Sequence, residues 1–146
     1  MSQADANLVA AIDQTLSELG RTDSKAGVLL TLDGLLVAAL GLLGSVTGVT
    51  LALVAVSAVA LVVSVVLALL AIRPRLGSPG VQDRAGFAYW ATATQDEIQA
   101  GMQEDRRLAR VQVLSRVVLW KMTRLRLAGD ASLVAVAALA AALITR

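Results

Sequence analysis

Two apolar stretches with a short polar break between them dominate the first half of the chain. From Ala26 to Ile72 the residues are apolar apart from Asp33 and a few hydroxyl side chains. The run is too long for one membrane crossing and long enough for two, because one helical crossing takes about 20 residues. The break falls at GSVTGVT, residues 44–50, where glycines and hydroxyl residues favour a turn. The pattern therefore predicts a transmembrane helical hairpin over residues 26–72.

Amphipathic segments lie on both sides of this hairpin. Before it, Leu8, Ile12 and Leu16 recur at helical spacing and predict a cytoplasmic leader over residues 1–25. This leader helix either ends at Gly20 or runs straight on into the membrane. After the hairpin, the prolines and glycines of RPRLGSPG (73–80) stop the second crossing. Apolar residues then recur at helical spacing from 92 to 127, within a basic cytoplasmic segment over 73–127.

The last apolar run predicts one more crossing. Residues 131–144 are apolar and, as a helix, about 21 Å long at 1.5 Å per residue, which is short for a span. Alanine dominates the run, so close packing against another helix is required. We therefore expect a third transmembrane helix over 128–146 and an all-α, multi-pass membrane protein.

Composition agrees with lipid-facing helices and limits the chemistry. Of 146 residues, 57% are hydrophobic but only 3% are aromatic, so Ala, Val and Leu supply most of the apolar content. The chain has no His and no Cys, and it therefore lacks the commonest general base, the commonest zinc ligand and every thiolate. No phosphate-binding loop or dinucleotide-binding fingerprint occurs. We expect no enzymatic activity and no metal or cofactor site.

The basic residues predict the orientation in the membrane. Arg21 and Lys25 precede the first crossing, and residues 73–126 hold ten Lys and Arg against five Asp and Glu. The loop at 44–50 has no charge. Because positive residues stay on the cytoplasmic side, the N-terminus and segment 73–127 are expected in the cytoplasm. The formal net charge of +2 is too small to indicate nucleic-acid binding.

Asp33 is a candidate functional residue because it is an acid inside an apolar run. It lies eight residues after Lys25, on the same helix face, so the lysine can reach outward while the acid faces other helices. A carboxylate within the hydrocarbon gates, relays a proton or holds helices together. Alternatively, the membrane begins at Gly34 and Asp33 lies among the lipid headgroups.

The second candidate is the basic cluster of the cytoplasmic segment, which comprises Arg106, Arg107, Arg110, Arg116, Lys121, Arg124 and Arg126. Arginine binds phosphate with two parallel hydrogen bonds, so the cluster suits an anionic ligand such as a nucleotide phosphate. Alternatively, it anchors the segment on acidic lipid. Within the same cytoplasmic segment, Glu104 and Arg107 are three residues apart and are expected to pair on an exposed helix face. The candidate ligand-binding residues are Arg107, Arg110, Arg116, Lys121 and Arg126.

Three segments, in order, resemble one known family. RTDSKAGVLLTLDGLL (21–36) resembles the Arg-x-Asp-x-Lys-Ala entry into the first membrane helix of the Pycsar transmembrane effector family. The RPR after the second crossing is similar to that family's basic-proline exit. VQVLSRVVLWKMTRLRLA (111–128) is similar to its signature helix. The resemblance carries over to Arg21, Asp23 and Lys25 at the membrane entry, and to Lys121 and Arg126 on the signature helix. Asp23 is a plausible partner for a cytoplasmic arginine, whereas Asp33 departs from the neutral residue expected there.

The resemblance implies a role in antiphage defence. Such effectors are encoded beside a nucleotide cyclase that makes a cyclic pyrimidine mononucleotide on infection. The nucleotide activates the effector, which impairs the bacterial inner membrane and kills the cell before the phage matures. Homo-oligomers are expected, because three thin helices cannot enclose a conducting path alone. Two other functions stay open: a holin-like or channel-forming protein that acts without nucleotide, and a non-lytic anchor whose 92–127 helix docks a partner.

Overall fold

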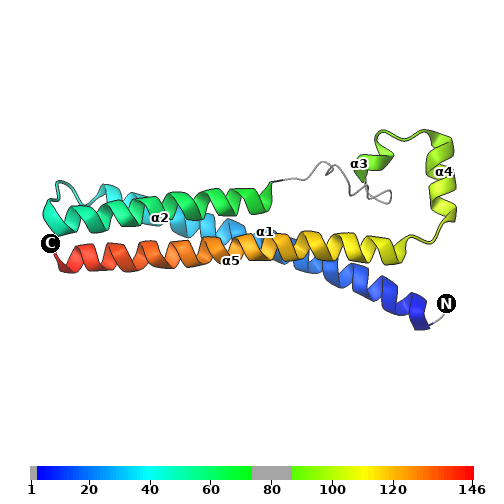
Figure 1. The fold of residues 1–146 in the computed structure, drawn as a ribbon, viewed down its shortest axis with the longest axis horizontal. Coiled ribbons are helices and arrows are strands. Elements are labelled where there is room, and N and C mark those ends of the chain that lie inside the picture. Colours follow the sequence, from blue (N-terminus) through cyan, green and yellow to red (C-terminus); the bar gives the residue numbers. More distant parts are fainter. Residues whose placement is uncertain (1–2, 74–86) are drawn as a thin grey trace. The chain divides into compact units, whose positions relative to one another are not determined.

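The computed structural model describes residues 3–73 and 87–146, and every element in these ranges is a helix. The all-α fold expected from the sequence is thereby confirmed. The RPRLGSPG segment, apart from Arg73, lies outside the described residues, so the stop that it predicts after the second crossing is not described. The elements are α1 (Gln3–Gly41), α2 (Gly48–Ile72), α3 (Phe87–Trp90), α4 (Gln95–Gln103) and α5 (Arg107–Ile144) (Figure 1).

Three of these helices, α1, α2 and α5, are long and apolar enough to cross a membrane. Helix α2 has the highest mean hydropathy, 3.0 in its most apolar window, and its 25 residues give a length of about 37 Å at 1.5 Å per residue. The C-terminal apolar run expected to form a third crossing is helical, and it is the second half of a 38-residue helix that is long and apolar enough to cross a membrane. Gly129 does not interrupt α5, because a single helical glycine costs only about 1 kcal/mol relative to alanine.

Helix α1 distinguishes between the two alternatives for the leader helix, which were an end at Gly20 and a continuation into the apolar stretch. It continues through Gly20 without a break and ends at Gly41. Residues 42–47 then link it to α2, at the position where the sequence predicted a turn. Gly44 and Gly48 have φ angles of +66° and +60°, a left-handed conformation that glycine adopts at little cost and other residues rarely adopt.

The contacts divide the chain into two units. The three-helix unit comprises residues 21–73 and 120–146, that is, the second part of α1, all of α2 and the second part of α5. The polar unit comprises residues 1–20 and 74–119, and its described elements are the first part of α1, α3, α4 and the first part of α5. In the polar unit, Thr94 and Glu97 form a reciprocal capping box at the start of α4.

The three-helix unit buries small and polar residues and exposes large apolar ones. The buried residues of α2 recur every three, four or seven positions, a heptad spacing that keeps one seam against neighbouring helices. They are Thr50, Ser57, Leu61, Ser64, Ala68 and Ala71. The same spacing recurs on α5 at Lys121, Ala128, Ser132, Ala135, Leu139 and Ala142. Valines and leucines such as Val28, Val59 and Leu133 lie exposed on the outside, as lipid-facing side chains do.

Candidate functional site

A buried carboxylate joins all three helices of the three-helix unit. Asp33 of α1 is fully buried, with 0% of its surface exposed. The Ser64 hydroxyl of α2 donates a 2.6 Å hydrogen bond to Oδ2 of Asp33. The Ser132 hydroxyl of α5 donates a hydrogen bond of the same length, 2.6 Å, to Oδ1. Each oxygen of one carboxylate therefore holds a different helix, and we call these three residues the Asp33 cluster.

The Asp33 cluster contains no cation. Within the described ranges, the ion pairs of the chain involve other residues, and none includes Asp33. Lys25, which the sequence places on the same face of α1, is exposed, whereas Asp33 is enclosed by protein. The side-chain partners of this carboxylate are therefore two neutral hydroxyls.

Further hydrogen bonds join α2 to α5 and to Thr145, the residue directly after α5, along the same seam. The Ser57 hydroxyl donates to the carbonyl oxygen of Ala135 at 2.9 Å. Nearer the chain's C-terminus, the Thr50 hydroxyl lies 3.2 Å from both the carbonyl and the hydroxyl oxygen of Thr145. The sequence analysis missed these contacts and the role of Ser132. The signal for them was present on α2, since Thr50, Ser57 and Ser64 are each seven residues apart and so lie on one heptad face.

An ion pair between two residues of the family motifs joins α1 to α5. The Lys121 ammonium lies 2.7 Å from Oδ1 of Asp23. Only 10% of the Lys121 side chain is exposed, against 43% of the Asp23 side chain. The sequence suggested an arginine as the partner of Asp23, and the structure corrects this to Lys121. One turn further along α5, the Arg124 guanidinium lies over the Trp120 ring, 3.8 Å from its centroid.

Arg107 is held by two carboxylates of the polar unit. Its guanidinium contacts Oδ1 of Asp5 on α1 at 2.5 Å and Oδ2 of Asp105 at 2.8 Å. Hydrogen bonds from the Arg107 side chain and backbone lower the pKa of Asp105 to about 2. Hydrogen bonds to Asp105, and then to Asp5, raise the pKa of Arg107 above its usual value. This arrangement fixes Arg107 at the start of α5.

The expected pairing of Glu104 with Arg107 is wrong. Helix α4 ends at Gln103, and Glu104 has an extended backbone, so the two residues do not share a helix at a spacing of three. Glu104 instead accepts hydrogen bonds from the Arg106 side chain, and its carboxylate is 2.5 Å from the nearest Arg106 nitrogen. The sequence pattern placed a continuous helix across this point, and the break changed the partners.

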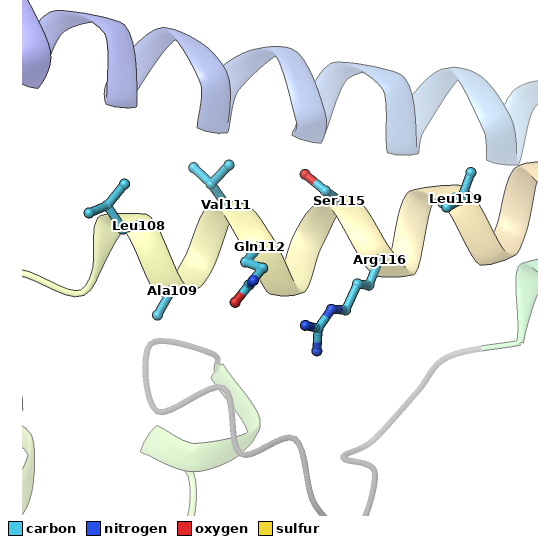
Figure 2. A pocket seen from close by; sticks show the side chains of 7 residues that line it. All are labelled: Leu108, Ala109, Val111, Gln112, Ser115, Arg116 and Leu119. Atoms are coloured by element: carbon cyan, nitrogen blue, oxygen red, sulfur yellow. The ribbon is translucent and has the colours of Figure 1, made fainter.

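A shallow groove lies along the first part of α5 in the polar unit. Its volume is about 580 Å³, and the residues that line it come from α5 itself. In Figure 2, Gln112 and Arg116 project from one side of the helix, and Val111 and Ser115 project from the other. The full lining is Leu108, Ala109, Val111, Gln112, Ser115, Arg116 and Leu119. The groove lining thus contains one cation, two polar side chains and four apolar ones.

The five basic residues expected to bind a ligand do not form one cluster within either unit. Arg107, Arg110 and Arg116 belong to the polar unit, whereas Lys121 and Arg126 belong to the three-helix unit. On α5, Arg107 and Arg116 are nine residues apart, so they point to opposite sides of the helix. Lys121 is engaged with Asp23, and Arg126 is exposed. Of the entry motif, Asp23 is thus placed by its ion pair, while Arg21 and Lys25 are exposed.

Together, the long apolar helices and the polar seam between them define an all-α membrane protein with three candidate spans. Residues 7–146 match the Pycsar effector protein domain, PycTM, which covers nearly the whole chain. The chain therefore belongs to the Pycsar effector family, as the entry and signature segments indicated, and is an antiviral effector with transmembrane helices. No curated protein and no solved structure matches the chain.

Proposed function

We propose that this protein responds to a cyclic pyrimidine mononucleotide and impairs the inner membrane of an infected bacterium. A nucleotide cyclase encoded nearby supplies the signal, and the cell dies before the phage matures, which is abortive infection. The observation that carries the proposal is the family match over residues 7–146 on a chain with three helices suited to crossing a membrane. The protein performs no catalytic step in this scheme, since the damage comes from rearrangement or assembly of the spans.

The α5 groove supports a nucleotide site centred on Arg116. Its guanidinium suits a phosphate, and Gln112, which projects from the same side of α5, can hydrogen-bond to the polar edge of a base. The groove volume falls within the range of about 300–1,000 Å³ that is usual for small-molecule sites. Arg107 and Lys121 are less suited to a ligand, because each already contacts a carboxylate. Arg110 and Arg126 stay secondary candidates.

The groove also supports a homo-oligomer. Usual ligand sites enclose about 70–90% of a small molecule, whereas the described lining of this groove comes from one helix. A second copy of the chain that packs over α5 would supply the missing wall, so the nucleotide would favour assembly by binding between copies. In this arrangement the N-terminus and segment 73–127 are cytoplasmic, where the nucleotide is made, as the distribution of Lys and Arg favours.

Membrane potential in living bacteria tests the proposal. A potential-sensitive dye is followed in cells that carry the protein with an active cyclase, with an inactive cyclase, or with no cyclase. Depolarisation that requires the active cyclase is the expected result. Depolarisation in all three strains would instead favour a holin-like pore that acts without nucleotide. An unchanged potential in every strain would favour the non-lytic anchor.

An arginine substitution tests the groove within the same assay. Arg116→Gln keeps a long polar side chain but removes the charge, and it should raise the nucleotide concentration needed for half-maximal depolarisation about tenfold or more, the worth of one charge-assisted hydrogen bond. Arg146→Gln, at the far end of the chain, is the matched control and should leave this concentration unchanged. Equal responses of the two variants would exclude Arg116 from the site.

A further inference from the structure

We propose that the Asp33 cluster is a latch that keeps the three helices together at rest, and that its release is the step that impairs the membrane. The inference deepens the proposed function, on which it rests for the nature of the activity. It assigns to Asp33, Ser64 and Ser132 the control of that activity, whereas the nucleotide site proposed above would lie on α5 within the polar unit.

The packing of the three-helix unit makes its closure depend on hydrogen bonds. Apolar side chains gain little by leaving lipid for a protein interior, so helices in a membrane associate through close packing and polar contacts. The buried seam offers few large side chains to interlock, being mostly Ala, Ser and Thr. Among the described residues, Leu61 is the largest side chain that is fully buried. At the Asp33 cluster, α1, α2 and α5 are all joined by side-chain hydrogen bonds.

The same cluster makes the closed arrangement easy to release. A buried carboxylate without a cation gives up its hydration, and two serine hydroxyls restore only part of what water supplied. Separation of the helices would let water reach Asp33 and return this hydration. The two hydrogen bonds to the carboxylate therefore hold the helices together, while the hydration that the carboxylate regains on opening favours the open state. A contact built in this way is suited to switching rather than to net stability.

Substitutions at position 33 can remove the charge either with or without the hydrogen bonds. Comparing them distinguishes a latch that opens from a static joint, meaning a contact that only stabilises the closed helices. Asp33→Ala removes both hydrogen bonds, so the helices should separate without nucleotide. Asp33→Asn keeps a group that can accept from one serine and donate to the other, but it removes the charge. The closed state should then be favoured, and activation should need about tenfold more nucleotide or more, because a charge within a membrane helix is costly. A static joint predicts that both variants only weaken the protein.

The serine variants give a graded response. Ser132→Ala or Ser64→Ala leaves Asp33 in place with one oxygen that lacks a donor. Each should shift the balance between closed and open states about ten- to hundredfold toward the open state, because the lost hydrogen bond has a charged acceptor. Thr31→Ala is the matched control, since Thr31 lies two residues before Asp33, is exposed, and bonds only within its own helix to the Gly27 carbonyl.

A disulfide between position 50 of α2 and position 145, directly after α5, tests which helices separate when the cluster is released. The chain has no cysteine, so a Thr50→Cys and Thr145→Cys pair can form only the intended bond within one chain or bonds between copies, which a gel separates. The two native hydroxyls are 3.2 Å apart, which places the substituted sulfurs within reach of each other. The full-length protein is reconstituted in phosphatidylethanolamine and phosphatidylglycerol vesicles, and loss of a potassium diffusion potential is followed with a dye, with and without reductant.

The expected result is a leak from the Asp33→Ala protein without nucleotide. If α2 and α5 separate, the disulfide suppresses this leak and reductant restores it. If α1 alone leaves, the leak persists with the disulfide formed, and either result supports the latch. The latch is overturned if Asp33→Ala and Ser132→Ala accumulate in the membrane and stay silent while the wild type responds to cyclic nucleotide. It is also overturned if Asp33→Asn leaks as Asp33→Ala does. Should Asp33→Ala not accumulate, Ser132→Ala decides alone. A leak from Asp33→Ala, with a wild type that ignores nucleotide, would support the latch and overturn the nucleotide response, so the two failures are distinct.

Discussion

The ion pair between Asp23 and Lys121 predicts an unequal response to loss of either partner. Lys121 is nearly enclosed, with 10% of its side chain exposed, whereas Asp23 keeps 43% of its side chain in contact with solvent. Removal of Asp23 leaves a buried ammonium with no carboxylate. Removal of Lys121 leaves a carboxylate that water can still solvate. The first loss should therefore cost more than the second.

The exposed fractions of the two side chains determine how much the two substitutions differ in their effect on the free energy of unfolding. Loss of one partner from a fully buried pair costs about 3–5 kcal/mol, mostly through the buried charge that stays behind. Because Asp23 is partly exposed, we expect Asp23→Asn to lower the free energy of unfolding by about 2–3 kcal/mol. Lys121→Met keeps the length and apolar stem of the side chain and leaves Asp23 solvated, so its cost should be about 1 kcal/mol or less.

Reversible unfolding in mixed micelles measures these costs. Helix content by circular dichroism and Trp120 fluorescence report on the transition, since Trp120 is one turn before Arg124 and stacks against it. The double variant completes the cycle and should show a coupling free energy of about 1–2 kcal/mol, because the two mutated groups touch. A larger cost for Lys121→Met than for Asp23→Asn would refute the argument from burial. A coupling near zero would show that the 2.7 Å contact contributes no stability.

Two further predictions concern the start of α5 and the hairpin turn. The pKa of Asp105 is lowered from 3.8 to about 2, so its contact with Arg107 is fully present above pH 3.8 and is lost as the pH falls through about 2. Carboxyl-carbon NMR should show this midpoint, and Arg107→Gln should return it toward 3.8. Gly44→Ala should cost about 1 kcal/mol of unfolding free energy, because alanine is strained at a φ of +66°. Gly34→Ala, within a helix and with open space at its Cβ position, should instead be neutral or stabilising by up to about 1 kcal/mol. Equal effects of the two glycine substitutions in thermal unfolding would contradict this.

The helices were predictable because lipid imposes a simple rule on sequence. A backbone within hydrocarbon must satisfy its own hydrogen bonds, so long apolar runs become helices and turns need glycine or polar residues. The break between residues 42 and 47 and the long α2 followed from this rule. The break between α4 and α5 did not, because the apolar spacing of residues 92–127 continues across it while local contacts of Glu104 and Asp105 end one helix and begin the next.

The residues of the candidate sites were easier to predict from the sequence than the side chains that contact them. Asp33 stood out as an acid in an apolar run, but the two serines that hold it are common residues in membrane helices. Ser132 lies 99 positions from Asp33, and only the packing of α5 against α1 brings it near. For the same reason, the partner of Asp23 was expected to be an arginine and is Lys121. The spacing of residues along one helix predicts which of them share a face. Contacts between two helices also depend on the register between the helices, which this spacing does not give.

Asp33 breaks the rule that the rest of the seam obeys. The other buried positions of α2 and α5 in the spanning region carry small, hydroxyl or aliphatic residues, which pack closely without a charge to hydrate. An asparagine at position 33 would keep hydrogen bonds to both serines at a lower solvation cost. A sequence that instead keeps a carboxylate there gains nothing in static stability. Under the latch proposed above, what it gains is a closed state that opens into water more readily than into lipid, and this would suit the proposed impairment of the membrane.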